Sequence, residues 1–392
     1  MSVRVAAGEP PDEGVRRARE LVLRHGWNAT AYQILNPGIR LWFAPEEDAV
    51  VGFVDSHGVR VVAGAPVCAE ERLAAVAEAF EAQATRDGLR VCYFCAGTRL
   101  DAVAAGGGRY RSVLIGAQPA WDPDDWVVMV GEHASLRAQL HRARNKGVRV
   151  EEWPAARASR DPELRRCLAE WLGTRGLPPL HFLVETRTLD RVYDRRVFVA
   201  LRGSEVAGFL VASPIPARRG WLIEQIIRGR GAPNGTAELM IDAAVRAVGE
   251  DGSHYVTLGL SPLSVRAGPL GAGGPGWLRA LLGWMRVHVH RFYNFEGLES
   301  FKAKFRPAVW EPIFAIAVGN GFSPRVLHGI AGAFSAGSVS STIARALLAA
   351  ARQELRWLAD RAVRDRSVPF PAHPPSSRSD TAPPSPAPRR KT

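Results

Sequence analysis

Short apolar runs and longer amphipathic segments alternate along most of the chain. The first group begins with three short apolar runs, which predict strands joined by a polar turn at 55–58. A segment with apolar side chains at helical spacing follows and stops at Gly88, which predicts a helix. The predicted strands of this group are 40–43, 49–54, 60–63, 89–96 and 112–115, and its helix is 69–87.

A second group repeats this rhythm of hairpin strands, a helix and a further strand. Its predicted helices are 135–145, 161–174, 236–248 and 276–291, and its strands are 148–153, 196–201, 206–213, 221–228, 255–260 and 314–318. The two groups share no detectable sequence repeat. The order predicts a mixed α/β fold with largely antiparallel central sheets, and it lacks the regular β-α alternation and Gly-rich first turn of a Rossmann domain.

The two ends of the chain differ from this pattern. A helix is predicted near 14–24, and no signal peptide is expected. A long helix is predicted at 335–366, and residues 367–392 hold eight prolines, which predicts a disordered tail. No run of eighteen apolar residues occurs, and 329–351 is too polar for a membrane span, although an interfacial helix stays open there.

Charge adds a partner class to this picture. The 392 residues carry a net charge of +12, which favours nucleic acid or anionic lipid headgroups. The alternative is an arginine-rich composition with no such partner. Lysine is rare, at positions 146, 302, 304 and 391 only, against 47 arginines. An ammonium is a compact charge with a tunable pKa, so Lys302 and Lys304 either serve chemistry or are two solvated surface charges.

The four cysteines predict neither a metal site nor a disulfide. Cys92 and Cys95 lie three apart on a predicted strand, so their side chains point to opposite faces. We expect all four thiols to be buried in a reducing compartment. The sequence assigns no metal and no cofactor.

Two segments favour contact with anions. The first is a basic run without an acid, made up of Arg137, His141, Arg142, Arg144, Lys146 and Arg149, which suits phosphate contacts or is a solvated face. The second is the turn 228–236, where glycines precede a helix that Asn234 or Thr236 would cap. This turn matches only half of an acyl-CoA pyrophosphate loop, and Pro233 removes one N–H, which argues against CoA.

A third candidate is the segment 292–312, which holds Asn294, Glu296, Glu299 and both lysines of interest. A helix over 296–305 would bring Glu299 and Lys302 together as an ion pair, which leaves Lys304 as the stronger catalytic candidate. The strand end at 258–263, with Ser261 in its turn, is a weaker candidate. No catalytic Ser-His-Asp order or H-E-x-x-H motif is present.

Several of these pieces together resemble the C-terminal synthase domain of phosphatidylglycerol lysyltransferases. The pieces are Ser135-Leu-Arg with Asn145-Lys-Gly, Pro233-Asn-Gly-Thr, Gly259-Leu-Ser-Pro-Leu, and the run from Tyr293 to Pro307 with Trp310-Glu-Pro. The resemblance covers roughly residues 30–320. It implies two tandem N-acetyltransferase-like (GNAT-like) domains, at 30–130 and 131–322, before a helical extension at 323–366 and the tail at 367–392.

The same resemblance implies transfer of an amino acid, of lysine type, from aminoacyl-tRNA to the headgroup hydroxyl of phosphatidylglycerol or a related lipid. It implies Lys302, Lys304 and Glu224 as catalytic residues. Substrate contacts are expected at the matched or nearby positions Arg228, Asn234, Gly235, Ser261, Asn294 and Glu296. Contacts to tRNA are expected at Arg137, Arg142, Arg144 and Lys146.

Family members carry a flippase module before the synthase, and this chain shows none, so we expect a separate membrane flippase. The protein would be cytoplasmic and peripheral on the inner face of the membrane. Two alternatives stay open. One is a GNAT-like transferase with a soluble acceptor, using aminoacyl-tRNA or acyl-CoA, and the other is a non-catalytic binder of RNA or an anionic membrane.

Overall fold

The computed structural model describes residues 12–106, 108–173, 182–183, 185, 187–288, 294–319 and 321–334. The chain divides into two compact units, Met1–Leu347 and Leu348–Thr392, and every described residue lies in the first. The predicted helix at 335–366 and the proline-rich tail lie outside the described residues.

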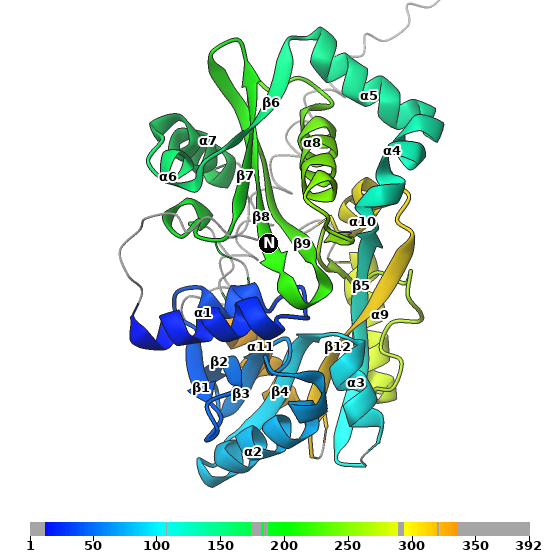
Figure 1. Cartoon of the computed structure of the whole chain (residues 1–392). Helices are drawn as coiled ribbons and strands as arrows, with labels where there is room; N and C mark the ends of the chain where they lie inside the picture. Colours follow the sequence, from blue (N-terminus) through cyan, green and yellow to red (C-terminus); the bar gives the residue numbers. More distant parts are fainter. Residues whose placement is uncertain are drawn as a thin grey trace, which may run out of the picture. The chain divides into compact units, whose positions relative to one another are not determined.

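The described strands form one mixed sheet of 12 strands (Figure 1). Their order is β1-β2-β3-β4-β12-β5-β10-β9-β8-β7-β6, and β11 also pairs with β5. The sequence predicted two central sheets, but β5 and β10 pair antiparallel and join the two halves into one. The strands are β1 (Arg40–Phe43), β2 (Val50–Ser56), β3 (Val59–Ala63), β4 (Arg90–Ala96), β5 (Tyr110–Trp121), β6 (Val148–Trp153), β7 (Arg196–Arg202), β8 (Glu205–Ile215), β9 (Gly220–Arg228), β10 (Tyr255–Thr257), β11 (Ser261–Pro262) and β12 (Val309–Val318).

Helices cover both faces of each half, so each half has two apolar cores. In the first half, α1, α9 and α11 share one core with short 3-10 turns, and α2 and α3 lie over the other face. In the second half, α8 with α4 and α5 covers one face, and α6 and α7 the other (Figure 1). The helices are α1 (Glu13–His25), α2 (Leu73–Arg86), α3 (Thr98–Ala105), α4 (Pro123–Glu132), α5 (Ala134–Asn145), α6 (Ala155–Ala158), α7 (Pro162–Gly173), α8 (Thr236–Glu250), α9 (Gly276–His288), α10 (Phe295–Ala303) and α11 (Pro324–Phe334).

Each half contains one parallel strand pair joined through a helix. In the first half these are β3, α2 and β4, and in the second half β9, α8 and β10. A parallel pair needs such a crossover, and the carboxyl ends of its strands are a common place for ligands. In the second half, the positions of β9 and β10 determine where the candidate site lies.

Candidate active site

The candidate site lies where β9 and β10 stop pairing. Their parallel register ends at Leu222 and Thr257, although β9 continues to Arg228. After β10 the chain turns at Gly259, with φ +70, and pairs through β11 with β5 instead. The backbone after Thr257 therefore leaves β9, and its carbonyl groups become available to side chains.

Lys302 reaches these carbonyl groups from α10. Its side chain is only 5% exposed, and its Nζ donates hydrogen bonds to the backbone oxygens of Gly259 and Leu260, each at 2.9 Å. Burial lowers the pKa of Lys302 from its usual 10.5 to about 7, because the charged form loses solvation. This amine therefore changes charge close to neutral pH.

The hydrogen bonds of Lys302 are compatible with a neutral amine. A neutral amine has two N–H groups, which can donate hydrogen bonds to the backbone oxygens of Gly259 and Leu260. It also has one lone pair, which can take up a proton. The next residue, Ser261, has a buried hydroxyl without a hydrogen-bond partner within the described part of the chain. The amine of Lys302 thus contacts the backbone directly before the residue that bears this hydroxyl group, and alcohol attack on an activated ester uses a proton acceptor and a hydrogen-bond donor.

The predicted ion pair between Glu299 and Lys302 is wrong. Glu299 instead pairs with Arg266 at 3.0 Å and with Arg286 at 3.4 Å, so it joins α10 to the loop after β11 and to α9. Burial raises the pKa of Glu299, but hydrogen bonds from Arg266 and Ser264 and the charge of Arg286 outweigh it and hold the pKa below 4.5.

Lys304 lies in a different environment from Lys302. Its side chain is exposed, and its Nζ is 3.4 Å from a carboxylate oxygen of Glu238 on α8. The ammonium also lies 5.5 Å from the ring centre of Phe301. The preference for Lys304 rested on a partner that Lys302 does not have, and the buried amine of Lys302 is the more unusual of the two.

Glu224 is the extra residue of a β-bulge on β9, because Val211 pairs with Gln225 and Ala212 pairs with Ile223. Its buried carboxylate accepts hydrogen bonds from Arg195, at 3.1 and 3.4 Å, and from the Ser213 hydroxyl. Glu224 therefore lies near the point where the strands separate, but its charge is already paired.

The turn before α8 places Arg228 and Asn234 at the surface. The predicted cap by Asn234 or Thr236 is wrong, because Gly235 occupies the cap position with φ +93 and no side chain caps the helix. A Cβ at Gly235 would lie 2.2 Å from the backbone oxygen of Gln139 on α5. Gly235 thus allows α5 and α8 to approach closely, a packing role that the sequence did not reveal.

Asn294 and Glu296 stabilise the start of α10. The side-chain oxygen of Asn294 accepts a hydrogen bond from the Gly297 N–H at 2.7 Å, and Glu296 is exposed in the first turn. Both therefore fix the helix that carries Lys302. Their contact with substrate stays a prediction.

The basic run forms α5, which packs on α8 through Leu136, Leu140 and Ala143. Its cations differ in how they are held. Arg142 and Lys146 are exposed, Arg144 pairs with Asp242 at 3.2 Å, and Arg137 donates to the carbonyl of Gly131. Contact of this helix with nucleic acid stays a prediction.

Sequence reasoning missed the arginines that organise the interior. Arg195 is buried, pairs with Glu224 and lies 4.9 Å from the ring centre of Tyr32. Arg218 pairs with Glu311 at 2.6 Å. Nothing local distinguishes these two from the other 45 arginines, because their partners lie far away in the sequence.

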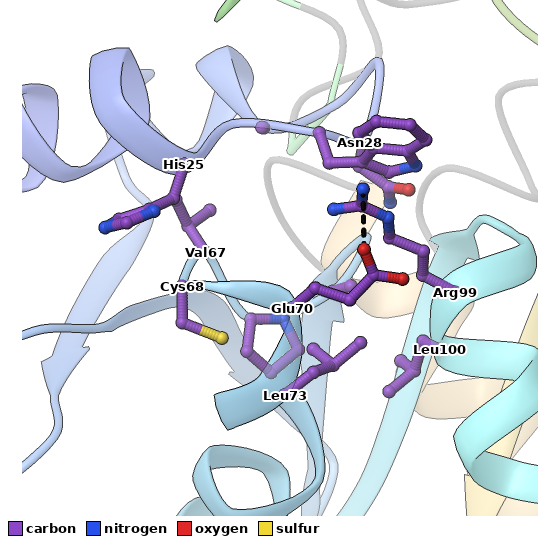
Figure 2. A pocket seen from close by; sticks show the side chains of 12 residues that line it. His25, Asn28, Val67, Cys68, Glu70, Leu73, Arg99 and Leu100 are labelled. Atoms are coloured by element: carbon purple, nitrogen blue, oxygen red, sulfur yellow. Dashed lines mark ion pairs between the residues drawn. The ribbon is translucent and has the colours of Figure 1, made fainter. Parts of the chain in front are cut away.

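A shallow pocket lies at the carboxyl ends of β3 and β4, the parallel pair of the first half (Figure 2). Arg99 and Glu70 form an ion pair across it at 2.9 Å, and the Arg99 guanidinium lies 3.3 Å from the Trp27 ring centre. The Asn28 side chain holds the backbone at Cys95 and Gly97. The polar groups named here are paired with one another, in contrast to Ser261.

Asp122, Asp124 and His254 are near enough to one another to hold a metal ion, since their ligand atoms lie within 4.8 Å. Asp122 already accepts the N–H of Asp124 as the cap of α4, and Asp124 and His254 are exposed. The cap explains the position of Asp122, and we assign no metal here. All four cysteines are free and buried, as predicted.

The family model described as "Phosphatidylglycerol lysyltransferase, C-terminal" matches residues 19–317. Among solved structures, the C-terminal domain (DUF2156) of a putative lysylphosphatidylglycerol synthetase from Agrobacterium fabrum is similar, with a TM-score of 0.71 and 23% identity over 83% of this chain and 98% of that one. L-PGS from Bacillus licheniformis is also similar, with a TM-score of 0.66 and 21% identity over 88% of this chain and 98% of that one. At these identities, the two similarities show the fold alone. A comparison with curated proteins gave no significant match.

Proposed function

The chain belongs to the phosphatidylglycerol lysyltransferase C-terminal family, and from this membership and the site around Lys302 we propose that it is an aminoacyltransferase acting on phosphatidylglycerol or a related lipid. The donor would be an aminoacyl-tRNA carrying an amino acid of lysine type. The observation that carries the proposal is the buried amine of Lys302 on the backbone oxygens of Gly259 and Leu260, directly before Ser261, whose buried hydroxyl has no hydrogen-bond partner among the described residues.

In the proposed reaction, the headgroup hydroxyl attacks the carbonyl carbon of the aminoacyl ester. Neutral Lys302 accepts the proton of that hydroxyl, the bond between the acyl carbon and the tRNA ribose oxygen breaks, and the ribose oxygen takes up a proton. The Ser261 hydroxyl would donate a hydrogen bond to the developing oxyanion. Glu224, Lys304 and Arg228 would act in binding, together with the proposed substrate positions Asn234, Asn294 and Glu296.

We also propose that the two halves are GNAT-like units that share one sheet, expected at residues 30–130 and 131–322, except that α9 and β12 of the second range pack with the first half. The matching arrangements β3-α2-β4 and β9-α8-β10 support this division. The exposed cations of α5 would contact tRNA, and product movement across the bilayer would fall to a flippase. Among the described residues, no helix has both the length and the apolar character needed to cross a bilayer.

The test is transfer of a labelled amino acid from charged tRNA to vesicles that contain phosphatidylglycerol. We expect labelled lipid with the wild-type chain, a large loss with Lys302→Met, and a smaller loss with Lys304→Met as the matched control. Absence of labelled lipid with folded protein and every aminoacyl-tRNA supplied would overturn the proposal.

Ribonuclease identifies the donor class in the same assay. If the donor is aminoacyl-tRNA, the treatment abolishes transfer. Activity that survives ribonuclease and requires a CoA thioester would instead show an acyltransferase with a different donor.

A further inference from the structure

We propose that α9 is a docking surface for an anionic lipid bilayer, which Trp277, Trp284 and Val287 enter at the headgroup level. The proposal extends the proposed function, since it states how the active site would come to lie against its lipid acceptor.

The first observation is that α9 has exposed apolar side chains. Its inner positions Leu278, Leu281 and Leu282 pack on the core of the first half. Trp277, Trp284 and Val287 are 45%, 55% and 61% exposed. Spacings of seven and three residues place these three along one side of the helix. Exposed tryptophan at such spacing is typical of a helix that lies in a membrane interface.

The charge of α9 decides which surface it fits. The helix contains no acidic residue, and its Arg279 is exposed, whereas the charge of Arg286 is paired with Glu299. The exposed valines of α4, Val127 and Val128, offer a contrast, because α4 has three acids and no basic residue. An anionic bilayer attracts the first helix and repels the second.

Contacts tie α9 to the catalytic helix. Arg286 donates to the backbone oxygen of Leu263 and lies 3.4 Å from Glu299, one turn before Lys302 on α10. The second partner of Glu299 is Arg266, which follows the exposed Val265. A bilayer bound to α9 would therefore lie next to α10, the helix that carries Lys302.

Cosedimentation with vesicles tests the docking surface. The double variant Trp277→Ser/Trp284→Ser keeps every charge, so it separates apolar insertion from general attraction by the basic protein. We expect it to bind vesicles of phosphatidylglycerol and phosphatidylcholine at least about ten-fold more weakly than the wild type, which is about 1.4 kcal/mol. The matched control Val127→Ser/Val128→Ser should bind as the wild type does, and Trp277→Phe/Trp284→Phe should recover much of the binding. Circular dichroism and thermal unfolding confirm that each variant is folded.

Equal binding by the serine variant and the wild type would overturn the proposal. The proposal would also be overturned if the serine variant differed from the wild type in oligomeric mass but not in vesicle binding. That result would mean that α9 contacts a second copy of the chain. Transfer to a dispersed short-chain phosphatidylglycerol separates docking from catalysis. Docking predicts that the serine variant loses transfer to vesicles and keeps transfer to the dispersed acceptor. If the wild type transfers to neither acceptor but still binds vesicles through α9, the proposed function fails and the docking surface stands.

Discussion

The two hydrogen bonds from Lys302 determine what its amine can do near neutral pH. If neutral Lys302 accepts the proton of the attacking hydroxyl, kcat/KM should rise with pH through about 7, the pKa that burial gives this amine. Lys302→Arg carries a permanent charge and should lose this rise. Its rate should be at least about 10²-fold below that of the wild type. The measurement is the pH–rate profile of each protein, with Lys304→Met as the control that keeps the rise. A profile of Lys302→Arg that matches the wild type would exclude this role.

The same pKa has a consequence for stability. Burial lowers the folded pKa of Lys302 to about 7, below the usual 10.5, so between these values the unfolded chain binds a proton that the folded chain lacks. The contribution of Lys302 to stability is therefore lowest below pH 7 and rises between pH 7 and 10.5, by up to about 1.4 kcal/mol per pH unit. Lys302→Met cannot titrate.

The free energy of unfolding of the wild type minus that of Lys302→Met should therefore increase from pH 7 to pH 10. Urea titrations at several pH values measure this difference. A difference that stays constant over this range would show that Lys302 keeps an ordinary pKa in the folded protein.

The sequence singled out the segment 292–312, and its preference for Lys304 over Lys302 rested on an ion pair with Glu299 that the structure does not have. Residues two apart on a helix face different directions, so Lys302 and Lys304 necessarily meet different surroundings. The partner that a lysine meets depends on other elements, here the carbonyl groups after β10 and Glu238 on α8. Local spacing favoured Glu299 as the partner of Lys302. Spacing alone does not reveal that Arg266 and Arg286 pair with this carboxylate instead.

At the scale of the elements, the contact between α5 and α8 depends on Gly235. Gly235→Ala places a Cβ against the Gln139 carbonyl and a side chain at φ +93, so it should lower the free energy of unfolding by about 2 kcal/mol or more. Gly231→Ala is the matched control in the same turn, because its Cβ meets nothing within 4 Å. Chemical denaturation compares the two. Equal effects would mean that the turn adjusts and that Gly235 is not needed for packing.

Glu299 joins three elements, so its charge should contribute to stability. Glu299→Gln keeps the size of the side chain and loses the charge, and we expect it to cost about 1–2 kcal/mol at neutral pH, since Arg266 is half exposed. The folded pKa of Glu299 lies below 4.5, so this contribution is present above that value and is lost as the pH falls through the folded pKa. Unfolding measured at pH 7 and near pH 3 should show the difference between the two proteins shrinking in acid.

Most elements could be predicted from their apolar pattern, and the misses have physical causes. The strand at 148–153 was placed correctly to the residue, because its pattern is bounded by Gly147 and Pro154. The helix α4 was missed, since its run of valines is typical of a strand. Asp122 as cap and Pro123 at the first position start this helix nonetheless, and both signals were present in the sequence.

At the scale of the whole molecule, the pairing of distant strands could not be predicted. The strand β12 follows every other described strand in the chain, yet it lies between β4 and β5 and pairs antiparallel with both. The sequence assigned it to the second group because it follows α10. Local patterns determine that a segment is a strand, but its neighbours depend on non-local contacts.

The position of β12 makes a prediction about truncated chains. A chain that ends at Pro307 lacks β12 and leaves β4 and β5 with unpaired edges inside the sheet, and it also loses the buried Ile313, Ala315 and Ile316. We expect it to lose cooperative unfolding. A chain that ends at Phe334 keeps every described element, and we expect it to unfold cooperatively. Urea denaturation followed by circular dichroism compares the three. Cooperative unfolding of the shorter chain would show that β12 is not needed to join β4 to β5.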